Sequence, residues 1–377
     1  MDGGTTITTG LAATVERGEL LAALTPLLRA VEARATIPIL SHVHISVMPG
    51  NRLRLVATDL DREASATLPA AGCVIGECTT HLQTMVKLVK SLPAGADVRL
   101  WMQGERLRVD CGRMSARLFV LPVADFPQMP HAGFERKFEL AADVLRGLID
   151  RTRFAISTEE TRYYLNGIFL HQHDADLVAA ATDGHRLAQV TTPMPDGALG
   201  MPAVIIPRAT VALLRDILGR DAAPVAVWIG ETRVRFSVGV FTVESKLVDG
   251  TYPEYAPVIP SMSSRKVTVG RKAMLAALAR VTAVSGFRMQ RVNLTVSPGS
   301  MAIESQWADL GVVTDAIDAT VSCRELSSIS FNAHYLRHAL AVIGGDVEFH
   351  FEEPYSPTLI RDTADARLRI VLMPMRI

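Results

Sequence analysis

An internal repeat constrains the fold of this chain more than any other feature of its sequence. Three β-like runs, RLFVLP, VESKLV and RIVLMP, contain Leu121, Leu247 and Met373, which follow one another at equal intervals of 126 residues. The run LRLVATD, ending at Asp59, recurs 124 residues later as LVAAATD, ending at Asp183. Self-similarity at a fixed period indicates repeated structural units. The sequence therefore predicts three copies of one domain.

Short linkers separate the predicted copies. QMPHAGFERK and APVIPSMSSRK combine Pro, Gly or Ser with charged residues, as interdomain connections do. They predict domains at 13–130, 131–260 and 261–377, with an N-terminal arm at 1–12 outside the repeat. Because domains usually contain about 100 to 200 residues, a chain of 377 residues is long enough for three.

Each copy has the same predicted order of helices and strands. In the second copy, Leu145, Leu148 and Ile149 follow the i, i+3, i+4 spacing of a helix with one buried face. AVWIG, RVRFSV and FTVESKLV alternate with period two, like half-buried antiparallel strands. Each domain is predicted to be α+β, with two helices packed on a mostly antiparallel sheet. The six expected helices lie within 17–34, 81–90, 140–153, 208–220, 271–288 and 332–344.

Charge is distributed unevenly between the predicted elements. The chain has 39 Lys and Arg and 39 Asp and Glu, so its formal net charge is zero. The six helix windows contain sixteen basic and five acidic residues, a net charge of +11, which leaves −11 for the remainder. Good helix formers include Glu as well as Lys and Arg, so propensity alone does not explain this excess. Basic helix surfaces favour binding to a polyanion.

Several protein classes do not fit the sequence. The four cysteines show neither a Cys-x-x-Cys pair nor zinc-site spacing, so no disulfide framework or structural zinc is indicated. The N-terminus lacks a signal-peptide pattern, and no apolar run reaches about 18 residues. These features predict a cytoplasmic protein with buried thiols at Cys73, Cys78, Cys111 and Cys323.

One segment, Thr182–Arg186, contains Thr, Asp and His and raises the question of a hydrolase. The chain has no Gly-x-Ser-x-Gly nucleophile elbow between a strand and a helix. Gly184 directly after Asp183 is instead typical of a turn between two strands. No phosphate-binding loop or dinucleotide fingerprint is present either. We therefore expect neither catalysis nor a cofactor.

A metal site is the second alternative. His171 and His173 alternate on a predicted strand and would share one face, with Asp174 and Asp176 close behind. A polar loop at a strand end explains the same residues, and no third ligand has diagnostic spacing. A metal-assisted hydrolase would require His171, His173 and Asp183 to lie close together.

A third possible function is that of a monomeric scaffold that binds peptides and never encircles DNA.

Seven runs, in order along the chain, resemble one known family. They are Thr-Ile-Pro at 36–38 with Ile-Leu at 39–40, Ala-Thr-Asp at 57–59, Asp-Phe-Pro at 125–127, Arg-Tyr-Tyr-Leu-Asn-Gly at 162–167, Ala-Thr-Asp-Gly-His-Arg-Leu at 181–187, Ser-Lys-Leu-Val-Asp-Gly at 245–250 and Met-Pro-Met-Arg-Ile at 373–377. From about Thr14 to Ile377 the chain resembles the beta subunit of bacterial DNA polymerase III, the sliding clamp family.

The resemblance implies a DNA polymerase processivity factor without catalytic activity. Two chains would form a homodimeric ring of six domains, with helices facing the hole, which encircles duplex DNA without sequence preference and slides on it. The ring would tether the DNA polymerase III catalytic subunit and other polymerases. A separate ATP-driven clamp loader would open it, and no metal or cofactor is implied.

The resemblance also assigns candidate binding residues. A partner-peptide cleft between the second and third domains, the predicted cleft, would contain Leu165, Thr182, Gly184, His185, Arg186, Leu187, Pro253, Val258, Tyr355, Pro357, Val371, Met373, Met375 and Arg376. For DNA, the resemblance assigns Arg34, Tyr163 and Tyr164. Helix charge alone adds Lys87, Lys90, Arg146, Arg208, Arg215, Arg271, Lys272, Arg280 and Arg337.

Three features depart from the family pattern. Ala116 stands where a larger apolar group is expected, and the segment 305–313 lacks the family's acidic cluster, so the dimer seam is expected to differ. Tyr355 and Pro357 add bulk at the rim of the predicted cleft. The sequence leaves open whether this is a housekeeping clamp or a diverged copy, one that serves a specialised polymerase or tolerates a cleft-binding inhibitor.

Overall fold

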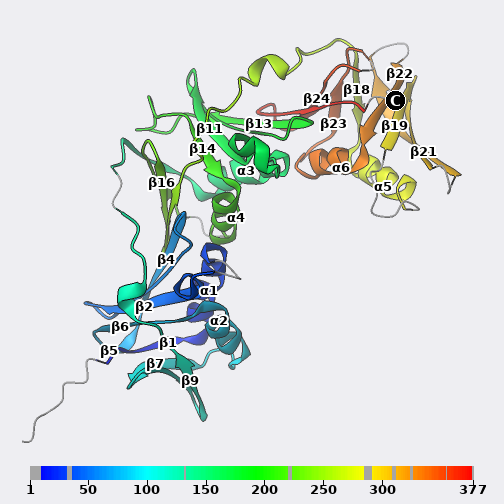
Figure 1. Ribbon diagram of the computed structural model, residues 1–377. Helices are drawn as coiled ribbons and strands as arrows, with labels where there is room; N and C mark the ends of the chain where they lie inside the picture. The colour runs from blue at the N-terminus through cyan, green and yellow to red at the C-terminus, as the bar shows by residue number, and fades with distance from the viewer. Residues whose placement is uncertain are drawn as a thin grey trace, which may run out of the picture. The chain divides into compact units, whose positions relative to one another are not determined.

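Three antiparallel sheets organise the chain. The computed structural model describes residues 10–31, 36–130, 133–219, 223–283, 291–307, 311–322, 326–353 and 355–375. It forms two compact units: Met1–Leu145 with Pro195–Pro202 and Ala209–Leu247, and Arg146–Met194 with Ala203–Arg208 and Val248–Ile377. The first unit contains a five-stranded and an eight-stranded sheet, and the second contains a twelve-stranded sheet (Figure 1).

The first unit contains two sheets, whose strands are named in the order in which they lie side by side. The five-stranded sheet consists of β5 (Ala71–Val74), β1 (Ala12–Glu16), β7 (Asp97–Gln103), β8 (Arg106–Cys111) and β9 (Met114–Phe119). The eight-stranded sheet consists of β10 (Arg136–Leu140), β15 (Val225–Ile229), β16 (Arg233–Val238), β17 (Phe241–Lys246), β4 (Arg62–Pro69), β3 (Arg52–Thr58), β2 (His42–Met48) and β6 (Gly76–His81).

The twelve-stranded sheet of the second unit joins residues from the second and third predicted domains. Its strands are β14 (Val204–Pro207), β11 (Gly167–His173), β12 (Asp176–Thr182), β13 (Arg186–Pro193), β25 (Leu368–Leu372), β24 (Thr358–Asp362), β23 (Val347–His350), β18 (Lys266–Val269), β21 (Gly311–Val321), β20 (Ser300–Trp307), β19 (Arg291–Ser297) and β22 (Leu326–Asn332). Every described strand pair is antiparallel, as the period-two runs predicted.

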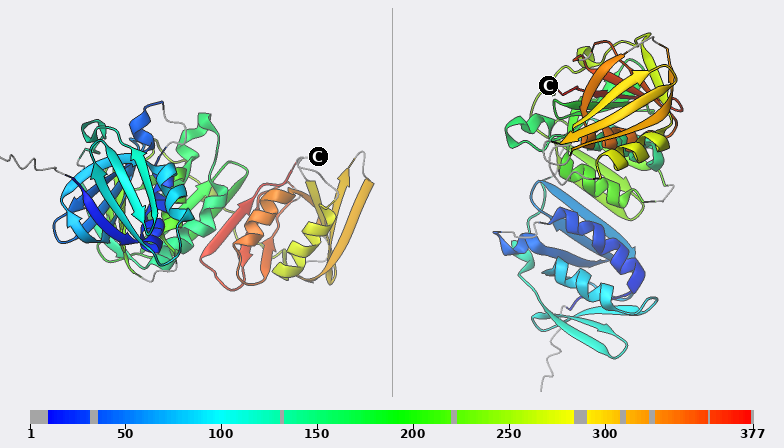
Figure 2. Two further views of the ribbon diagram at one scale, coloured as in Figure 1. Left: turned by 90° about the horizontal axis from the view of Figure 1, so that it is seen from below. Right: turned by 90° about the vertical axis from the view of Figure 1, so that its right-hand side faces the viewer.

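Six α-helices occur among the described residues, and each lies within its predicted window except α2, which extends one residue beyond it. They are α1 (Arg17–Leu27), α2 (Leu82–Ser91), α3 (Ala142–Thr152), α4 (Arg208–Ile217), α5 (Arg271–Val281) and α6 (Ala333–Ala341). In the second unit, α5 and α6 pack beside each other against the strands of the third domain (Figure 2). Short 3-10 helices are η1 (Leu28–Ala30), η2 (Pro38–Ser41), η3 (Val123–Asp125), η4 (Arg153–Ala155), η5 (Glu160–Leu165) and η6 (Ala256–Val258).

The first helix is shorter than the predicted window 17–34. Pro26 lies in the last turn of α1, and the chain then tightens into η1, where the Leu28 N–H contacts the carbonyl oxygens of Thr25 and Pro26. Proline has no N–H for the helical ladder and crowds the preceding turn, which explains the early end. At the N-terminus, residues 1–9 of the predicted arm lie outside the described residues, whereas Leu11 and Ala12 are buried.

The repeat is visible in two equivalent hairpin turns, one in each unit. In the first, the Thr58 hydroxyl donates to the Arg62 carbonyl at 2.8 Å, and Asp59 accepts from the Arg62 N–H at 2.9 Å. In the second, the Thr182 hydroxyl donates to the Arg186 carbonyl at the same distance of 2.8 Å. The turns follow β3 and β12, which end the two related runs LRLVATD and LVAAATD. Equivalent local sequences have thus produced equivalent turns.

Strand pairing across repeats holds each unit together. In the first unit, β17 of the second repeat pairs with β4 of the first, and in the second unit β25 of the third repeat pairs with β13 of the second. Both β17 and β25 belong to the related runs VESKLV and RIVLMP. The same strand of each following repeat therefore closes the sheet of the preceding one.

The two junctions differ in side-chain chemistry. At the β4–β17 junction, Glu63 and Glu244 lie directly opposite each other. Arg235 is 2.7 Å and Arg233 3.4 Å from the Glu244 carboxylate, and Arg54 is 3.7 Å from Glu63. Burial raises the pKa of Glu63. This junction is a charged network.

Candidate functional site

The candidate site begins at the hairpin turn between β12 and β13 in the second unit. Asp183 Oδ1 accepts from the N–H groups of His185 at 2.9 Å and Arg186 at 3.0 Å, and the Thr182 hydroxyl accepts from the Gly184 N–H at 3.1 Å. Gly184 has φ +87°, a left-handed conformation that favours glycine. The segment is the predicted turn, and its Asp and Thr are occupied in holding it.

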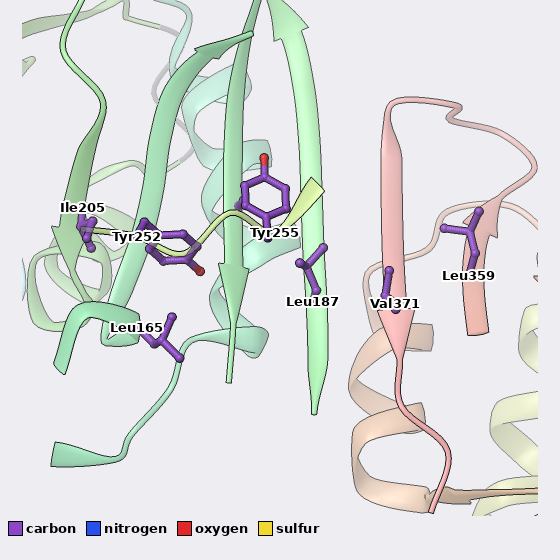
Figure 3. Packing of buried hydrophobic residues seen from close by; sticks show 8 residues of the cluster. Leu165, Leu187, Ile205, Tyr252, Tyr255, Leu359 and Val371 are labelled. Carbon is purple, nitrogen blue, oxygen red and sulfur yellow. The ribbon is translucent and has the colours of Figure 1, made fainter. Parts of the chain in front are cut away.

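An apolar floor lies next to this turn. Leu187 on β13 and Val371 on β25 are direct partners across the strand pair, and Leu359 on β24 is the next partner of Val371. Leu165, from the end of η5, belongs to the same buried cluster, and Tyr252 packs over the sheet (Figure 3). The four aliphatic side chains are at most 4% exposed. The floor therefore combines Leu187 of β13 with residues 172 and 184 positions later in the chain.

Three apolar residues of the predicted cleft are exposed. Val258 is 45%, Met373 37% and Tyr355 60% exposed. The Met373 N–H donates to the His185 carbonyl at 2.9 Å, which fixes the C-terminal segment beside the hairpin turn. Among the other residues of the predicted cleft, Pro253 is exposed and Pro357 and Met375 are half-buried, while Arg376 lies outside the described part of the chain.

Arg186 points toward helix α6. Its Nε donates to Asp183 Oδ2 at 2.9 Å, and its Nη1 lies 2.8 Å from His338 Nδ1. The guanidinium carbon lies 4.3 Å from the ring centroid of Tyr335 and 5.5 Å from that of Phe154. Arg186 thus ties the hairpin turn to α6 and to η4. Sequence reasoning placed Arg186 in the predicted cleft but missed Tyr335, His338 and Phe154, which have no local motif.

The contact with Arg186 requires a neutral His338, because Nδ1 must accept the guanidinium N–H. Burial, followed by the charges of His334, Arg186, Arg337 and Arg153, lowers the pKa of His338 to about 4. The unfolded chain has an ordinary histidine pKa of about 6.5. The folded pKa is the lower one, so the contribution of His338 to stability is complete above pH about 6.5 and is lost as the pH falls toward 4.

We expect acidification from pH 7 to 5 to lower the melting temperature of the parent protein more than that of His338→Gln. Glutamine keeps an acceptor for Arg186 but does not titrate. The measurement is thermal unfolding at several pH values, with His173→Gln, a change at an exposed histidine, as the control. Parallel curves for parent and His338→Gln would contradict this assignment.

The candidate DNA residues are two tyrosines of η5 and a set of basic residues that differ in exposure. Tyr163 is 54% exposed and Tyr164 half-buried in η5, and their rings are 5.8 Å apart. Five helix cations are exposed, namely Lys87, Lys90, Arg208, Lys272 and Arg280. The cations Arg146, Arg215, Arg271 and Arg337 are half-buried, and Arg34 lies outside the described residues.

Charge segregation persists in the folded helices, although less strongly than the windows suggested. The helices α1 to α6, as described, contain eleven basic and four acidic residues, a net charge of +7. Some cations have acidic neighbours: Arg280 donates to Asp315 at 2.7 Å, and Arg146 lies 3.5 Å from Asp150. Their availability to a polyanion is thereby reduced.

The metal-assisted hydrolase alternative is wrong. His173 pairs with Asp176 at one end of β12, whereas Asp183 follows Thr182 at the other end. A strand rises about 3.3 Å per residue, so His173 and Asp183 are roughly 20 Å apart. Among the residues that the structure describes, no three His, Cys, Asp or Glu side chains are grouped to hold a metal ion.

Family models cover nearly the whole chain. The N-terminal, central and C-terminal domain models of the DNA polymerase III beta subunit match residues 11–130, 139–254 and 256–376. Three clamp-type domains with antiparallel sheets define a ring-forming class of protein. The chain belongs to the DNA polymerase III beta subunit family, the beta sliding clamps. It is accordingly a non-catalytic processivity subunit.

Relatives match the chain from end to end. The beta sliding clamp of Caulobacter vibrioides (strain NA1000 / CB15N) is 39% identical over 371 residues, covering 97% of this chain and 99% of the relative. That of Escherichia coli (strain K12) is 32% identical over 366 residues, with the same two coverages.

No helix among the described residues is long and apolar enough to cross a membrane.

Two solved structures illustrate the likeness in fold. A crystal structure of the Caulobacter crescentus beta sliding clamp with polyethylene glycol bound has a TM-score of 0.92 and 39% identity, and covers 98% of this chain and 99% of that one. The Bartonella birtlesii sliding clamp bound to griselimycin has a TM-score of 0.92 and 38% identity, and covers 98% and 100%.

Proposed function

We propose that two copies of this chain close into a ring around duplex DNA, and that the predicted cleft holds peptide tails of the proteins that the ring tethers. These are the DNA polymerase III catalytic subunit, other polymerases and an ATP-driven clamp loader. Membership of a DNA-associated family supports action in the cytoplasm. The observation that carries the ring is a pattern of unpaired strand edges.

The last strand of the second and of the third repeat pairs with a strand of the preceding repeat. β17 pairs with β4, and β25 pairs with β13, but β9, the equivalent strand of the first repeat, pairs only with β8 among the described residues. In the third repeat, residues 311–318 of β21 pair with β20 alone among the described residues. Unpaired edges are templates for another strand. A second chain would bring its β9 to this edge of β21, and an isologous dimer would satisfy both edges.

We expect the protein to be a dimer with twice the 40.9 kDa mass of one chain. Phe119 on β9 is 73% exposed and Val312 on β21 is 56% exposed. The double variant Phe119→Asp, Val312→Asp therefore places a charge on each of the two strands proposed to pair between chains, without altering a buried core. It should shift the mass toward the monomer in light scattering at micromolar concentration.

The control for the seam is Leu199→Asp, which changes another apolar side chain that is 67% exposed. This variant should remain dimeric. If the parent protein were monomeric at every concentration, the ring model would be wrong and the monomeric peptide-binding scaffold would be favoured.

The basic helices support retention on DNA by topology. A net charge of +7 attracts phosphates, but no groove-reading element is evident in the part of the chain that the structure describes. We expect loaded protein to stay on nicked circular DNA at about 200 mM salt, where ordinary phosphate-bound proteins lose most of their affinity. Linearising the circle should release it, and blocking both ends should restore retention. Equal, salt-sensitive loss from circles and linear DNA would refute this model.

The exposed rim of the predicted cleft supports binding of apolar tails. Loss of an apolar side chain at a binding hot spot costs about 2 kcal/mol, and each 1.4 kcal/mol is about tenfold in affinity. We therefore expect Met373→Ala to weaken a fluorescent polymerase-tail peptide about thirtyfold while melting temperature and dimer mass stay unchanged. Met262→Ala, at a methionine that is 65% exposed, is the matched control. Unchanged affinity in Met373→Ala would remove the cleft assignment.

A further inference from the structure

Helix α6 of the third repeat is attached to the hairpin turn beside the predicted cleft. Tyr335 and His338 are three residues apart on α6, so they share one side of the helix. The Arg186 side chain, which is only 10% exposed, lies against both. Its guanidinium lies over the Tyr335 ring, and its Nη1 donates to His338 Nδ1 at 2.8 Å. The turn is thereby attached to a histidine 152 residues later in the chain.

Asp183 extends this attachment through the turn. Its Oδ2 accepts from Arg186 Nε at 2.9 Å, and its Oδ1 accepts from the N–H groups of His185 and Arg186. The His185 carbonyl in turn accepts the Met373 N–H at 2.9 Å. A continuous series of hydrogen bonds therefore leads from His338 to Met373, which is an exposed apolar residue of the predicted cleft.

The apolar floor begins directly after this turn. Leu187 follows Arg186 on β13 and lies opposite Val371 on β25 (Figure 3). A displacement of the turn would therefore move Leu187 on the floor, together with the backbone contact that fixes Met373. Binding residues have to be held within about 0.5 Å of their productive geometry by the groups that support them. The turn is thus a point at which the predicted cleft requires support.

The equivalent turn in the first unit has no such attachment. There Arg62 pairs with Asp59 in the same way, but Arg62 Nε has no hydrogen-bond partner among the described residues. Helix α4, the second helix of its repeat, is the counterpart of α6 in that unit. Counted from the first residue of each helix, Leu213 in α4 takes the place that His338 has in α6. Leu213 is buried and cannot accept a hydrogen bond. The attachment is therefore not a general feature of the repeat, and it occurs at the junction that contains the apolar floor.

We propose that His338 is a positioning residue for the predicted cleft, which by accepting the Arg186 guanidinium N–H fixes the turn at 182–186 in the arrangement that binds an apolar tail. The inference rests on the proposed peptide-binding function and deepens it. His338 is half-buried and acts through Arg186 and Asp183, not by contact with the tail. A neutral imidazole suits this role, because it accepts a hydrogen bond without drawing Arg186 away from the Asp183 carboxylate, as a second carboxylate would.

The test is the affinity of a fluorescent polymerase-tail peptide for the full-length protein and its variants, with the melting temperature of each variant measured alongside. His338→Leu removes the acceptor for Arg186 and should weaken binding about tenfold. His338→Gln keeps an acceptor and should bind within about twofold of the parent. In protein that already has Arg186→Met, His338→Leu should cause no further loss, because residues that act through one contact are not additive.

Arg337→Gln is the matched structural control. Arg337 precedes His338 on α6, but its Nη2 donates to the Thr282 hydroxyl at 2.9 Å, at the C-terminal end of α5. This variant should lower the melting temperature and leave the tail affinity unchanged, which distinguishes a general loosening of α6 from loss of the Arg186 contact. His338→Ala, which also lacks an acceptor, takes the place of His338→Leu if the leucine variant does not fold.

The outcomes separate the two claims. If His338→Leu binds the tail as tightly as the parent while Met373→Ala weakens it, the positioning role is overturned and the proposed function stands. If His338→Gln loses as much affinity as His338→Leu, or if Arg337→Gln also loses affinity, the effect is one of general stability and the role is equally overturned. A further loss from His338→Leu in the Arg186→Met protein would show that His338 does not act through Arg186, and the assignment would be wrong. If the parent protein does not bind the tail, the peptide-binding function itself fails.

Discussion

Backbone pairing between strands of different repeats is the interaction on which the rest of the structure depends. A free sheet edge exposes a row of N–H and C=O groups, and this chain fills two such edges by pairing β17 with β4 and β25 with β13. The second pairing brings Leu187 beside Val371 and the Met373 N–H to the His185 carbonyl. Without it, the apolar floor would not exist, because it uses side chains from both β13 and β25.

Much of this architecture could be predicted from the sequence, because its causes are local or periodic. The 126-residue period predicted the repeated α+β domains, alternating runs predicted the strands, and Asp183 followed by Gly184 predicted the turn at φ +87°. Helix ends were predicted less well, since Pro26 ends α1 earlier than its apolar pattern suggests. The described helices carry +7 where the windows carry +11, because Arg29 and Arg153 follow the ends of α1 and α3, while Glu32, Arg34, Arg220 and Arg288 lie outside the described residues.

The features that sequence reasoning missed all depend on contacts between distant positions. Arg186 meets His338 152 residues later, and nothing near either residue signals their contact at 2.8 Å. The juxtaposition of Arg361 and Arg369 follows from the register of β24 and β25, which a hydrophobic pattern does not specify to the residue. The metal-site alternative at His171 and His173, which the sequence did not favour, fails because the length of β12 places Asp183 far from both histidines.

The charged junction in the first unit would limit how many partner tails one chain can bind under the proposed function. Where the second unit has Leu187 and Val371, the equivalent strand pair has Glu63 opposite Glu244, with arginines beside them. Desolvating such a network under an apolar tail would cost more than the tail's burial returns. Under the proposed function, each chain would therefore offer one site for an apolar tail, and a ring of two chains would offer two. Such a ring could bind two partner proteins at once, and a third could bind only after one of the first two had dissociated.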